Sequence, residues 1–287
     1  MRPVLVVGDV MVDVVARMSG PLAAGSDTPA SIVTRPGGAG ANVAAWLAEA
    51  GVDVTLAARV GADVAAARAA KGLRHHGVRL QLTEDPERPT GTCVVLVAPD
   101  GERSMLPDPG ANAALAPGDL PSRCFRRGAH LHVAGYTLLR AGSVDAGRVA
   151  LARARAAGMT VSIDPSSAAL LAQHGADRFL RLVGHPDLLL PNADEARALT
   201  GKGDPRAAAR ALSLHAREVV VTRGAEGALW SDGRVTLEAP AVVAGAVADT
   251  TGAGDAFTAG FLAAWLDGAP AGAALERGHE LAVRALA

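Results

Sequence analysis

Short, continuous runs of apolar residues recur along the chain, and each one stops at glycine, asparagine, aspartate or proline. Runs of this length, rich in valine and leucine, are typical of strands that are buried on both faces. They predict strands at residues 4–9, 53–61, 130–136, 160–165, 187–192 and 218–224.

Segments of helical character, several of them rich in alanine and arginine, separate these runs. They predict helices at residues 42–51, 143–158, 168–183, 194–200 and 205–216. Strands that alternate with helices form a mostly parallel sheet with helices on each side, so we expect a three-layer α/β/α fold. Ligands bind beyond the carboxyl ends of such strands. The residues that close the runs should therefore share one rim: Asp164, Asn192, Thr222 and Gly224.

Two stretches, residues 12–38 and 89–112, break this rhythm. They alternate apolar and polar residues, contain turn sequences such as "PDGE", and have no helical period. This pattern predicts antiparallel strands that stand apart from the main sheet, as a flap would. No linker suited to two independent domains and no internal repeat occurs, so we expect a single domain over residues 1–287.

Composition and charge restrict the class of protein. The chain has 287 residues, 49% of them hydrophobic, which is enough for a sizeable core. The formal net charge is −1, and no run of lysine or arginine indicates nucleic acid or an anionic membrane. Cys93 and Cys124 are too few and too far apart for a metal motif or a disulfide framework. Asp9 and Asp13 interrupt any N-terminal signal segment, and the longest apolar run near the C-terminus has 11 residues, so a cytoplasmic protein is expected.

Two familiar nucleotide-binding sequences do not fit this chain. The segment "TGKGDP" has the Gly-Lys of a phosphate-binding loop but lacks the Ser or Thr that should follow. The segment "GGAGANVA", residues 37–44, begins like a dinucleotide fingerprint. However, Val43 takes the place of the third glycine, and Pro36 precedes the motif where a strand should end. A Rossmann dinucleotide site is therefore not favoured.

The strongest chemical motif is "DTTGAGDAF", residues 249–257. It leads into an amphipathic segment with Phe257, Phe261 and Trp265 four residues apart, so the glycines lie where a helix begins. The free N–H groups there, and the positive end of the helix dipole, attract an anion. The carboxylate of Asp255 repels an anion, so its position directly behind the glycines needs an explanation.

Two interpretations of Asp255 are open. In the first, it is a plain carboxylate in the first helical turn, and the glycines form a turn. In the second, it accepts the proton of an attacking hydroxyl while the N–H groups of residues 252–254 hold a transferring phosphoryl group. The first interpretation does not explain three small residues after Asp-Thr-Thr, so we favour phosphoryl transfer.

Four motifs in this order resemble those of the ribokinase-like, or PfkB, carbohydrate kinases, and the resemblance covers nearly the whole chain. "DTTGAGDAF" is similar to the C-terminal signature of that family, and "GGAGANVA" with "LAEAGVDVTLAARVGAD" to its N-terminal signature. "PNADE" resembles the family's N-x-x-E motif, and "VTRGAEGAL" its nucleotide-binding strand and turn.

The resemblance implies a role for each matching residue. Asp255 would be the catalytic base, and the anion hole would consist of Gly252, Ala253 and Gly254. Sugar hydroxyls would be held by Asp13, Gly38 and Asn42, with Gly37 letting the backbone approach.

The resemblance also implies ATP and Mg²⁺ as cofactors. Its nucleotide site would contain Asn192, Glu195, Thr222, Gly224 and Gly227. Asn192 and Glu195 would order magnesium through water molecules. Asp249 and Thr251 are candidate ligands of a monovalent cation such as K⁺.

The flap would correspond to the family's β-lid, at approximately residues 12–36 and 89–110, which closes over the sugar and offers a surface for a homodimer. Arg103 in this segment is a candidate contact to an acidic substrate, and a solvated strand residue is the alternative. Gly135 and Tyr136 stand where ribokinases carry a glutamate that touches the sugar, which argues against D-ribose.

Simpler roles are open for several of these residues. Asn42 can be a plain helix N-cap, Glu195 a first-turn carboxylate, and Thr222 a turn residue. His130 and His132 share one strand face, where a place in the core is favoured over a metal site.

The sequence thus predicts an ATP-dependent kinase that phosphorylates a primary hydroxyl of a sugar or a sugar-like molecule. A nucleoside kinase on the same fold is the alternative within enzymes. A non-catalytic nucleotide-binding regulator is the alternative outside them, and the presence of Asp255 behind its glycines argues against it.

Overall fold

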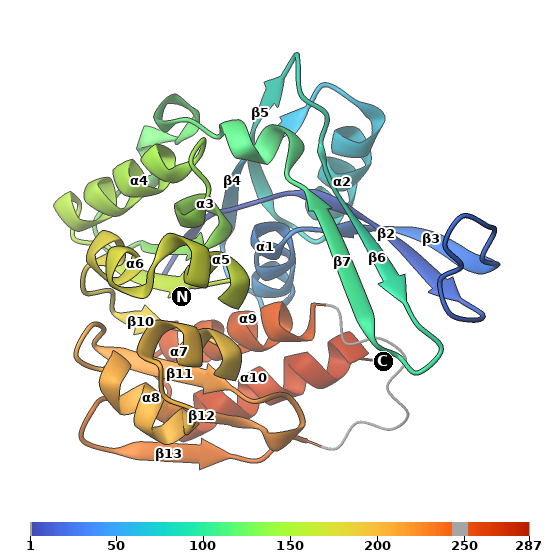
Figure 1. Ribbon diagram of the computed structural model, residues 1–287. Helices are drawn as coiled ribbons and strands as arrows, with labels where there is room; N and C mark the ends of the chain where they lie inside the picture. Colours follow the sequence, from blue (N-terminus) through green and yellow to red (C-terminus); the bar gives the residue numbers. More distant parts are fainter. Residues whose placement is uncertain (1, 243–251, 287) are drawn as a thin grey trace.

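The computed structural model describes residues 2–242 and 252–286 of the chain, and two sheets organise them (Figure 1). The larger sheet has nine strands. In spatial order these are β13 (Thr236–Ala239), β12 (Ala228–Ser231), β11 (Glu218–Thr222), β10 (Leu188–Leu189), β9 (Thr160–Asp164), β8 (His130–Ala134), β1 (Val4–Val7), β4 (Val54–Gly61) and β5 (Arg79–Asp85).

The larger sheet is parallel from β11 to β5, and only β12 and β13 at one edge run antiparallel to their neighbours. The prediction of a mostly parallel sheet is confirmed. The chain leaves β1 toward β4 on one side and later returns to β8 on the other side. Strand order therefore reverses at β1 and β8, which is where an open parallel sheet leaves room for a ligand beyond its carboxyl ends.

Helices cover both faces of this sheet and make the three layers that the sequence predicts. On one face lie α3 (Tyr136–Leu139), α4 (Val144–Ala156), α5 (Ala168–His174), α6 (Ala176–Val183), α7 (Ala193–Thr200) and α8 (Pro205–Leu212). On the other lie α1 (Ala39–Glu49), α2 (Val64–His75), α9 (Ala253–Leu266) and α10 (Ala271–Leu286). Short 3₁₀ turns are η1 (Gly110–Ala114), η2 (Pro117–Asp119), η3 (Ser122–Cys124) and η4 (Gly224–Glu226).

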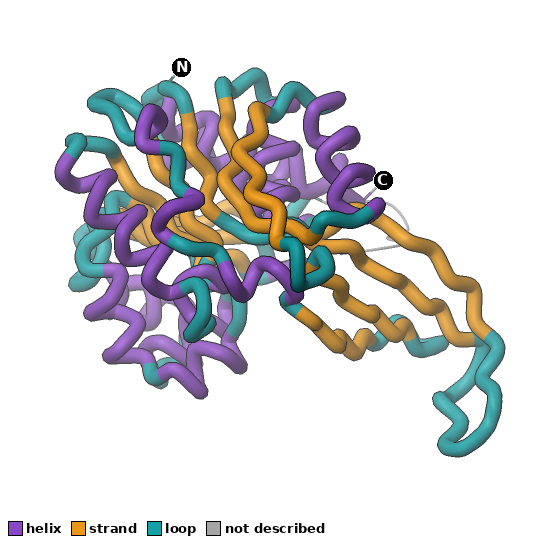
Figure 2. The backbone as a smooth tube through the Cα atoms, turned by 90° about the horizontal axis from the view of Figure 1, so that it is seen from above, coloured by secondary structure: helices purple, strands orange, loops and turns teal. Residues whose placement is uncertain are grey.

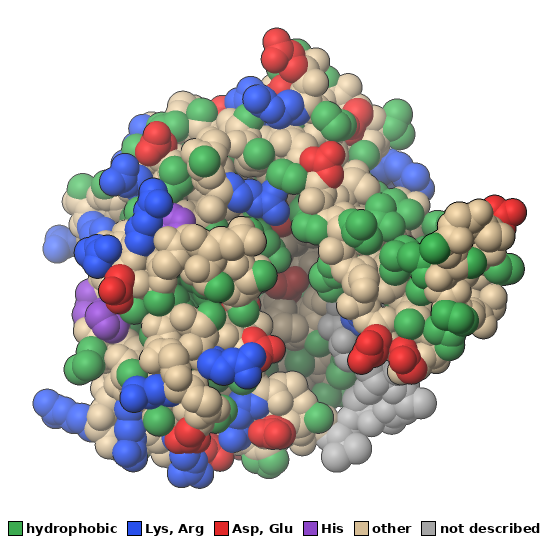
Figure 3. Space-filling model, in the orientation of Figure 1, with side chains coloured by type: hydrophobic (Ala, Val, Ile, Leu, Met, Phe, Trp, Pro, Cys, Tyr) green, Lys and Arg blue, Asp and Glu red, His purple; other side chains and the backbone are tan. Residues whose placement is uncertain are grey.

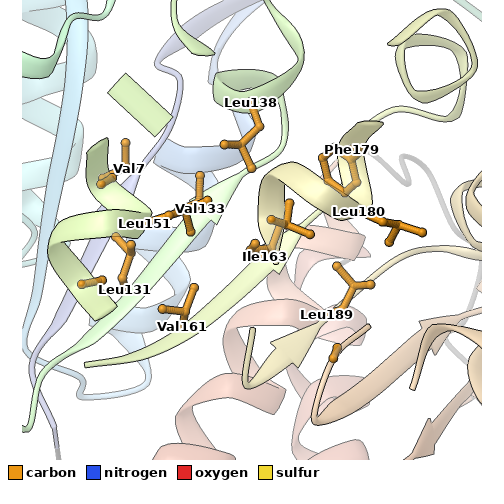
Figure 4. Close-up of a cluster of buried hydrophobic side chains, with 14 of the residues drawn as sticks. Val7, Leu131, Val133, Leu138, Leu151, Val161, Ile163, Phe179, Leu180 and Leu189 are labelled. Carbon is orange, nitrogen blue, oxygen red and sulfur yellow. The ribbon is translucent and has the colours of Figure 1, made fainter. Parts of the chain in front are cut away.

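Two hydrophobic clusters, one on each face, hold the layers together. Successive residues of a strand point to opposite faces, so Leu5 and Val7 join one cluster while Val4 and Val6 join the other. Figure 4 shows the first cluster, in which Val7 and Ile163 of the sheet lie among side chains of the covering helices. Each fully buried valine or leucine contributes roughly 1.5–3 kcal/mol relative to exposure, so the rim of this sheet rests on a well-packed support.

The four-stranded sheet, called here the small sheet, projects from the body (Figure 2). Its order is β3 (Ala30–Gly37), β2 (Met11–Met18), β6 (Gly91–Val97) and β7 (Arg103–Asp108). The sequence predicted antiparallel strands here, but the central pair, β2 and β6, is parallel. The reason is that β2 follows β1 and β6 follows β5, and those two strands of the larger sheet point the same way.

One predicted helix is wrong in its extent. Residues 168–183 were expected to form a continuous helix, but α5 ends and α6 begins at Gly175, whose φ is +91°. A glycine adopts that angle without steric cost, and it turns the chain between the two helices.

His130 and His132 lie in the core, as the sequence favoured, and both are fully buried. The two rings share the hydroxyl of Ser162, at 2.7 Å from Nε2 of His130 and 2.8 Å from Nδ1 of His132. Within residues 2–242 and 252–286, no group of three or more His, Cys, Asp or Glu side chains is arranged to hold a metal ion. No helix in that part of the chain is long and apolar enough to span a bilayer.

Candidate active site

A cleft of about 1130 Å³ lies between the rim of the larger sheet and the small sheet. Figure 3 shows it as a hollow between the two parts, with acidic side chains visible inside. It brings together predicted site residues from distant parts of the chain: Asp13, Gly38, Asn42, Arg103, Asn192, Glu195, Thr222, Gly252, Gly254 and Asp255.

Helix α9 begins at the floor of the cleft. Gly252 precedes it with a φ of +78°, which favours glycine. The first hydrogen bond within the helix runs from the amide of Ala256 to the carbonyl of Gly252 at 2.9 Å. The amides of Ala253, Gly254 and Asp255 therefore have no acceptor inside the helix, as is usual for a first turn. They form a cradle of N–H donors at the positive end of the helix dipole.

The carboxylate of Asp255 lies in this first turn and accepts a hydrogen bond from Nδ2 of Asn42 at 2.8 Å. Burial raises the pKa of Asp255 well above its ordinary value, and the bond from Asn42 opposes that rise. The negative charges of Asp164, Asp9 and Asp13 raise the pKa further. A carboxyl with a raised pKa binds a proton more readily, which suits a general base.

The "GGAGAN" turn packs against the start of the small sheet. Gly38 has a φ of +99°, and a Cβ there would lie 2.7 Å from the carbonyl oxygen of Asp9. A Cβ on Gly37 would lie 2.5 Å from the carboxylate of Asp13. Gly37 is not among the residues that line the cleft. In this structure its missing side chain makes room for Asp13.

Asn192 and Glu195 join at the start of α7 in a reciprocal cap. The amide of Asn192 donates to Oε2 of Glu195 at 2.9 Å, its Nδ2 donates to Oε1 at 2.8 Å, and the amide of Glu195 donates to Oδ1 of Asn192 at 2.9 Å. Glu195 is 4% exposed. Burial and the neighbouring charge of Asp164 raise the pKa of Glu195 to about 8, and burial raises that of Asp164 to about 6.

Thr222 ends β11 and forms an isolated parallel bridge with Asn192, so the two predicted nucleotide residues are neighbours at the rim. Gly224 and Gly227 follow in the turn to β12, but they do not line the cleft. A Cβ on Gly227 would lie 2.1 Å from the carbonyl oxygen of Ala239. The close approach of β13 therefore accounts for that glycine.

Ala253 contributes its place in the first turn of α9 but does not line the cleft. Arg103 lines it from β7. Asp249 and Thr251 lie outside the described residues.

Asp9, Tyr136, Arg140 and Asp164 also line the cleft. None of the four was named as a site residue from the sequence, although Asp164 was expected at the ligand-binding rim and Tyr136 at the position of a sugar-contacting glutamate. Arg140 places its guanidinium carbon 5.3 Å from the centre of the Tyr136 ring. Burial raises the pKa of Tyr136, so its hydroxyl stays protonated. Asp9 and Asp164 stand at the ends of predicted strands, so the rule that rims bind ligands points to both. Tyr136 closes the predicted strand at residues 130–136, but Arg140 lies beyond it, at the end of the short helix α3, and carried no such signal.

Solved structures and curated proteins that resemble this chain include kinases. A structure of adenosine kinase from Sinorhizobium meliloti superposes with a TM-score of 0.88 at 26% identity, covering 98% of this chain and 92% of that one. Fructokinase from Vibrio cholerae O395, solved with fructose, ADP and calcium ion, gives 0.84 at 28% identity, covering 100% and 93%. A fructokinase from Vibrio alginolyticus is 32% identical over 277 residues, which is 92% of this chain and 84% of the fructokinase.

The three-layer fold, with its cleft under a small sheet, is that of a ribokinase-like kinase. The pfkB family carbohydrate kinase model matches residues 1–286, and the chain belongs to this family. It is thus a carbohydrate kinase, a phosphotransferase whose acceptor is an alcohol group.

Proposed function

We propose that the protein transfers the γ-phosphoryl group of ATP to a primary hydroxyl of a sugar or a sugar-like molecule, with Asp255 as the base. The observation that carries this proposal is the position of the Asp255 carboxylate in the same helical turn as amides that have no acceptor within the helix. A transferring phosphoryl group needs donors for its charge, and the attacking hydroxyl needs an acceptor for its proton.

The chain's own groups divide the reaction between them. Asp13, Gly38 and Asn42 hold the acceptor's hydroxyls at the start of α1. The acceptor oxygen bonds to the γ-phosphorus as its proton passes to Asp255, and the bond from that phosphorus to the bridging oxygen breaks and releases ADP. The amides of residues 252–254, of which those of Ala253 and Gly254 have no acceptor within α9, stabilise the charge on the phosphoryl oxygens during transfer.

The nucleotide would lie toward Thr222, Gly224 and Gly227. Mg²⁺ fits beside Asn192 and Glu195, because the site offers oxygen donors to a hard cation. The oxygens of Glu195 already accept hydrogen bonds from Asn192, so contact through water fits better than direct ligation. When bound, Mg²⁺ supplies positive charge that offsets the phosphates. K⁺ is proposed only from Asp249 and Thr251.

We further propose that residues 1–287 form one domain in which the small sheet acts as a lid. Its inner face puts Asp13 over the cleft beside Val95, Met105 and Pro107. Closure would exclude water, which otherwise competes with the acceptor. The outer face carries exposed apolar side chains such as Ile32 and Leu106, and we propose it as the surface of a homodimer.

One observation favours a nucleoside as the second candidate acceptor. The ring of Tyr136 and the apolar side chains of Val95, Met105 and Pro107 line the same cleft as Asp13. An aromatic ring and an apolar wall suit a flat base better than a bare sugar. The similarity to an adenosine kinase supports this candidate.

The test is an acceptor screen of the purified protein with magnesium-ATP, using neutral sugars, acidic sugars and nucleosides. We expect turnover on at least one acceptor that carries a primary hydroxyl. ATP binding without turnover on any acceptor would favour a regulator and contradict the proposal. Asp255→Asn should bind ATP as the wild type does and not turn over. If Asp255→Asn turned over at nearly the wild-type rate, Asp255 could not be the base.

A further inference from the structure

We infer that Asp9 is a positioning residue that fixes the first turn of α1 and so holds Asn42 against Asp255. The inference rests on the proposed role of Asp255 and adds a residue that acts through Asn42.

Asp9 supplies the cap that α1 lacks in its own sequence. The residue at the N-cap position is Gly38, which has no side chain to accept a hydrogen bond. Instead, the carboxylate of Asp9, at the end of β1, accepts from the amide of Ala39 at 3.3 Å and of Gly40 at 3.1 Å. Its main-chain oxygen accepts from the amide of Ala41 at 3.0 Å. Three successive amides of the first turn thus bind one residue of another element.

A second close contact, between Gly40 and Gly8, limits the movement of α1. Gly40 and Gly8 approach so closely that a Cβ on Gly40 would lie 2.7 Å from the Cα of Gly8. Asn42 follows within the same turn, and its amide donates to the carbonyl of Gly38 at 2.9 Å. A helix seated this firmly sets the direction of the Asn42 side chain, which donates to Asp255.

The surroundings of Asp9 show that its carboxylate is held for these contacts. It is 5% exposed, and burial raises its pKa. The amides of Gly40 and Ala39 and the nearby charge of Arg140 oppose that rise. A carboxylate at a helix N-terminus is stabilised by the amides of the first turn and by the helix dipole. The buried carboxylate of Asp9 and the first turn of α1, which has no cap of its own, therefore stabilise each other.

Asp63 offers a matched control in the same molecule. It caps α2 through the amide of Ala66 at 2.8 Å, and it also accepts from the amide and hydroxyl of Thr90 at 2.7 and 2.8 Å. No residue of α2 lines the cleft. Loss of Asp63 therefore removes a comparable cap without touching the path to Asp255.

The experiment compares Asp9→Ala, Asp9→Asn and Asp63→Ala with the wild type on the best acceptor from the screen. We expect Asp9→Ala to lower kcat about tenfold or more, because catalytic geometry is sensitive to small displacements. The KM for ATP should stay unchanged. Asp63→Ala should lower Tm about as much as Asp9→Ala does, but it should leave kcat within about twofold of the wild-type value. Asp9→Asn keeps one acceptor oxygen, so its kcat should fall between those of Asp9→Ala and the wild type. This variant also tests the inference if Asp9→Ala fails to fold.

A double-mutant cycle with Asn42→Ala separates positioning from general loosening. If Asp9 acts through Asn42, Asp9→Ala should cost far less kcat in the Asn42→Ala background than in the wild type. Additive losses, or a kcat for Asp9→Ala equal to that for Asp63→Ala, would overturn the inference.

A structure of Asp9→Ala gives a readout that does not need activity. We expect the distance between Nδ2 of Asn42 and the Asp255 carboxylate to exceed about 3.5 Å, beyond hydrogen-bond range. An unchanged contact would overturn the inference. Absence of wild-type turnover on every acceptor would instead defeat the proposed function, and this distance would still decide the positioning role.

Discussion

The two sheets of this protein use similar residues but bury them to very different extents. Every residue of β1 in the larger sheet is at most 2% exposed, because helices cover both faces. In β3 of the small sheet, all residues but the last are exposed, and Ile32 is 64% exposed. Five buried apolar side chains of the small sheet form one modest cluster: Met11, Val15, Cys93, Val95 and Val97.

This difference divides the proposed work of the site. The groups assigned to chemistry, Asp255 and its amides, begin a helix that packs on the larger sheet. Two of the residues assigned to the acceptor, Asp13 and Arg103, stand on the small sheet, while Gly38 and Asn42 lie at the start of α1. At the junction, Asn112 exchanges hydrogen bonds with the main chain of Val10 and donates to the carbonyl of Pro109, both at 2.9–3.0 Å. A rigid support suits bond making, and a thinly covered sheet suits closure.

The largest expected effect is that of Asp255→Asn on the body side of the cleft. Loss of the proposed general base should lower kcat by about 10³-fold or more. The raised pKa of Asp255 means that its charged form costs stability at neutral pH. The neutral variant should therefore unfold at a higher temperature than the wild type. Steady-state kinetics and a thermal melt of the ligand-free proteins check both, and a lower Tm would contradict the electrostatic argument.

On the small sheet, Asp13→Asn should act mainly on binding. We expect the acceptor KM to rise about 10- to 100-fold, because a hydrogen bond to a charged group contributes roughly 1.5–3 kcal/mol. The KM for ATP should stay nearly unchanged. Arg103→Ala is the matched control on the same sheet. The KM of this variant for a neutral acceptor should barely change, and its KM for an acidic acceptor should rise. If Asp13→Asn lowered kcat without raising the acceptor KM, the proposed division of roles between the two sheets would be contradicted.

The core of the larger sheet should make stability sensitive to acid. Burial lowers the pKa of His132 from 6.5 to about 4, so the unfolded chain binds a proton there before the folded one does. Stability from this group is lost as the pH falls from about 6.5 toward 4, by about 2 kcal/mol between pH 7 and pH 5. Urea unfolding of His132→Gln and wild type at both pH values should show a weaker loss in the variant. Equal losses would place the acid sensitivity elsewhere.

The smallest effect tests the comparison itself, using the two isoleucines of the chain, one in each sheet. Ile163→Val in the larger sheet should lower the free energy of unfolding by roughly 0.5–1.5 kcal/mol. Ile32→Val on the small sheet should change it by less than about 0.5 kcal/mol, as for most exposed positions. An equal or larger cost at Ile32 would mean that its face is covered in solution. Ile32→Asp with a measurement of molecular mass would then show whether a second copy covers it.

Much of this architecture was predictable because its signals are local. Buried strands are continuous apolar runs, and a parallel sheet places their ends on one rim. The glycines before Asp255 mark a helix start within a few residues of sequence. These patterns placed β1, β4 and β8 to β11 and most of the helices, but the predicted elements did not include β5, β12, β13, α2, α3 and α10.

Other features depend on partners that are remote in the sequence. The donor to Asp255 is 213 residues away in Asn42, and the cap of Gly40 comes from Asp9, 31 residues earlier. Gly37 and Gly227 carry no side chain because Asp13 and Ala239 approach them. The parallel pairing of β2 with β6 follows from the direction of strands in the other sheet.

What the sequence alone determined is therefore most of the buried strands, the helices between them and the type of chemistry, since these depend on periodicity and on short motifs. What only the tertiary structure decided is which group stands next to which. A hydrogen bond depends on distances of a few tenths of an ångström between segments that meet only after the whole chain has packed.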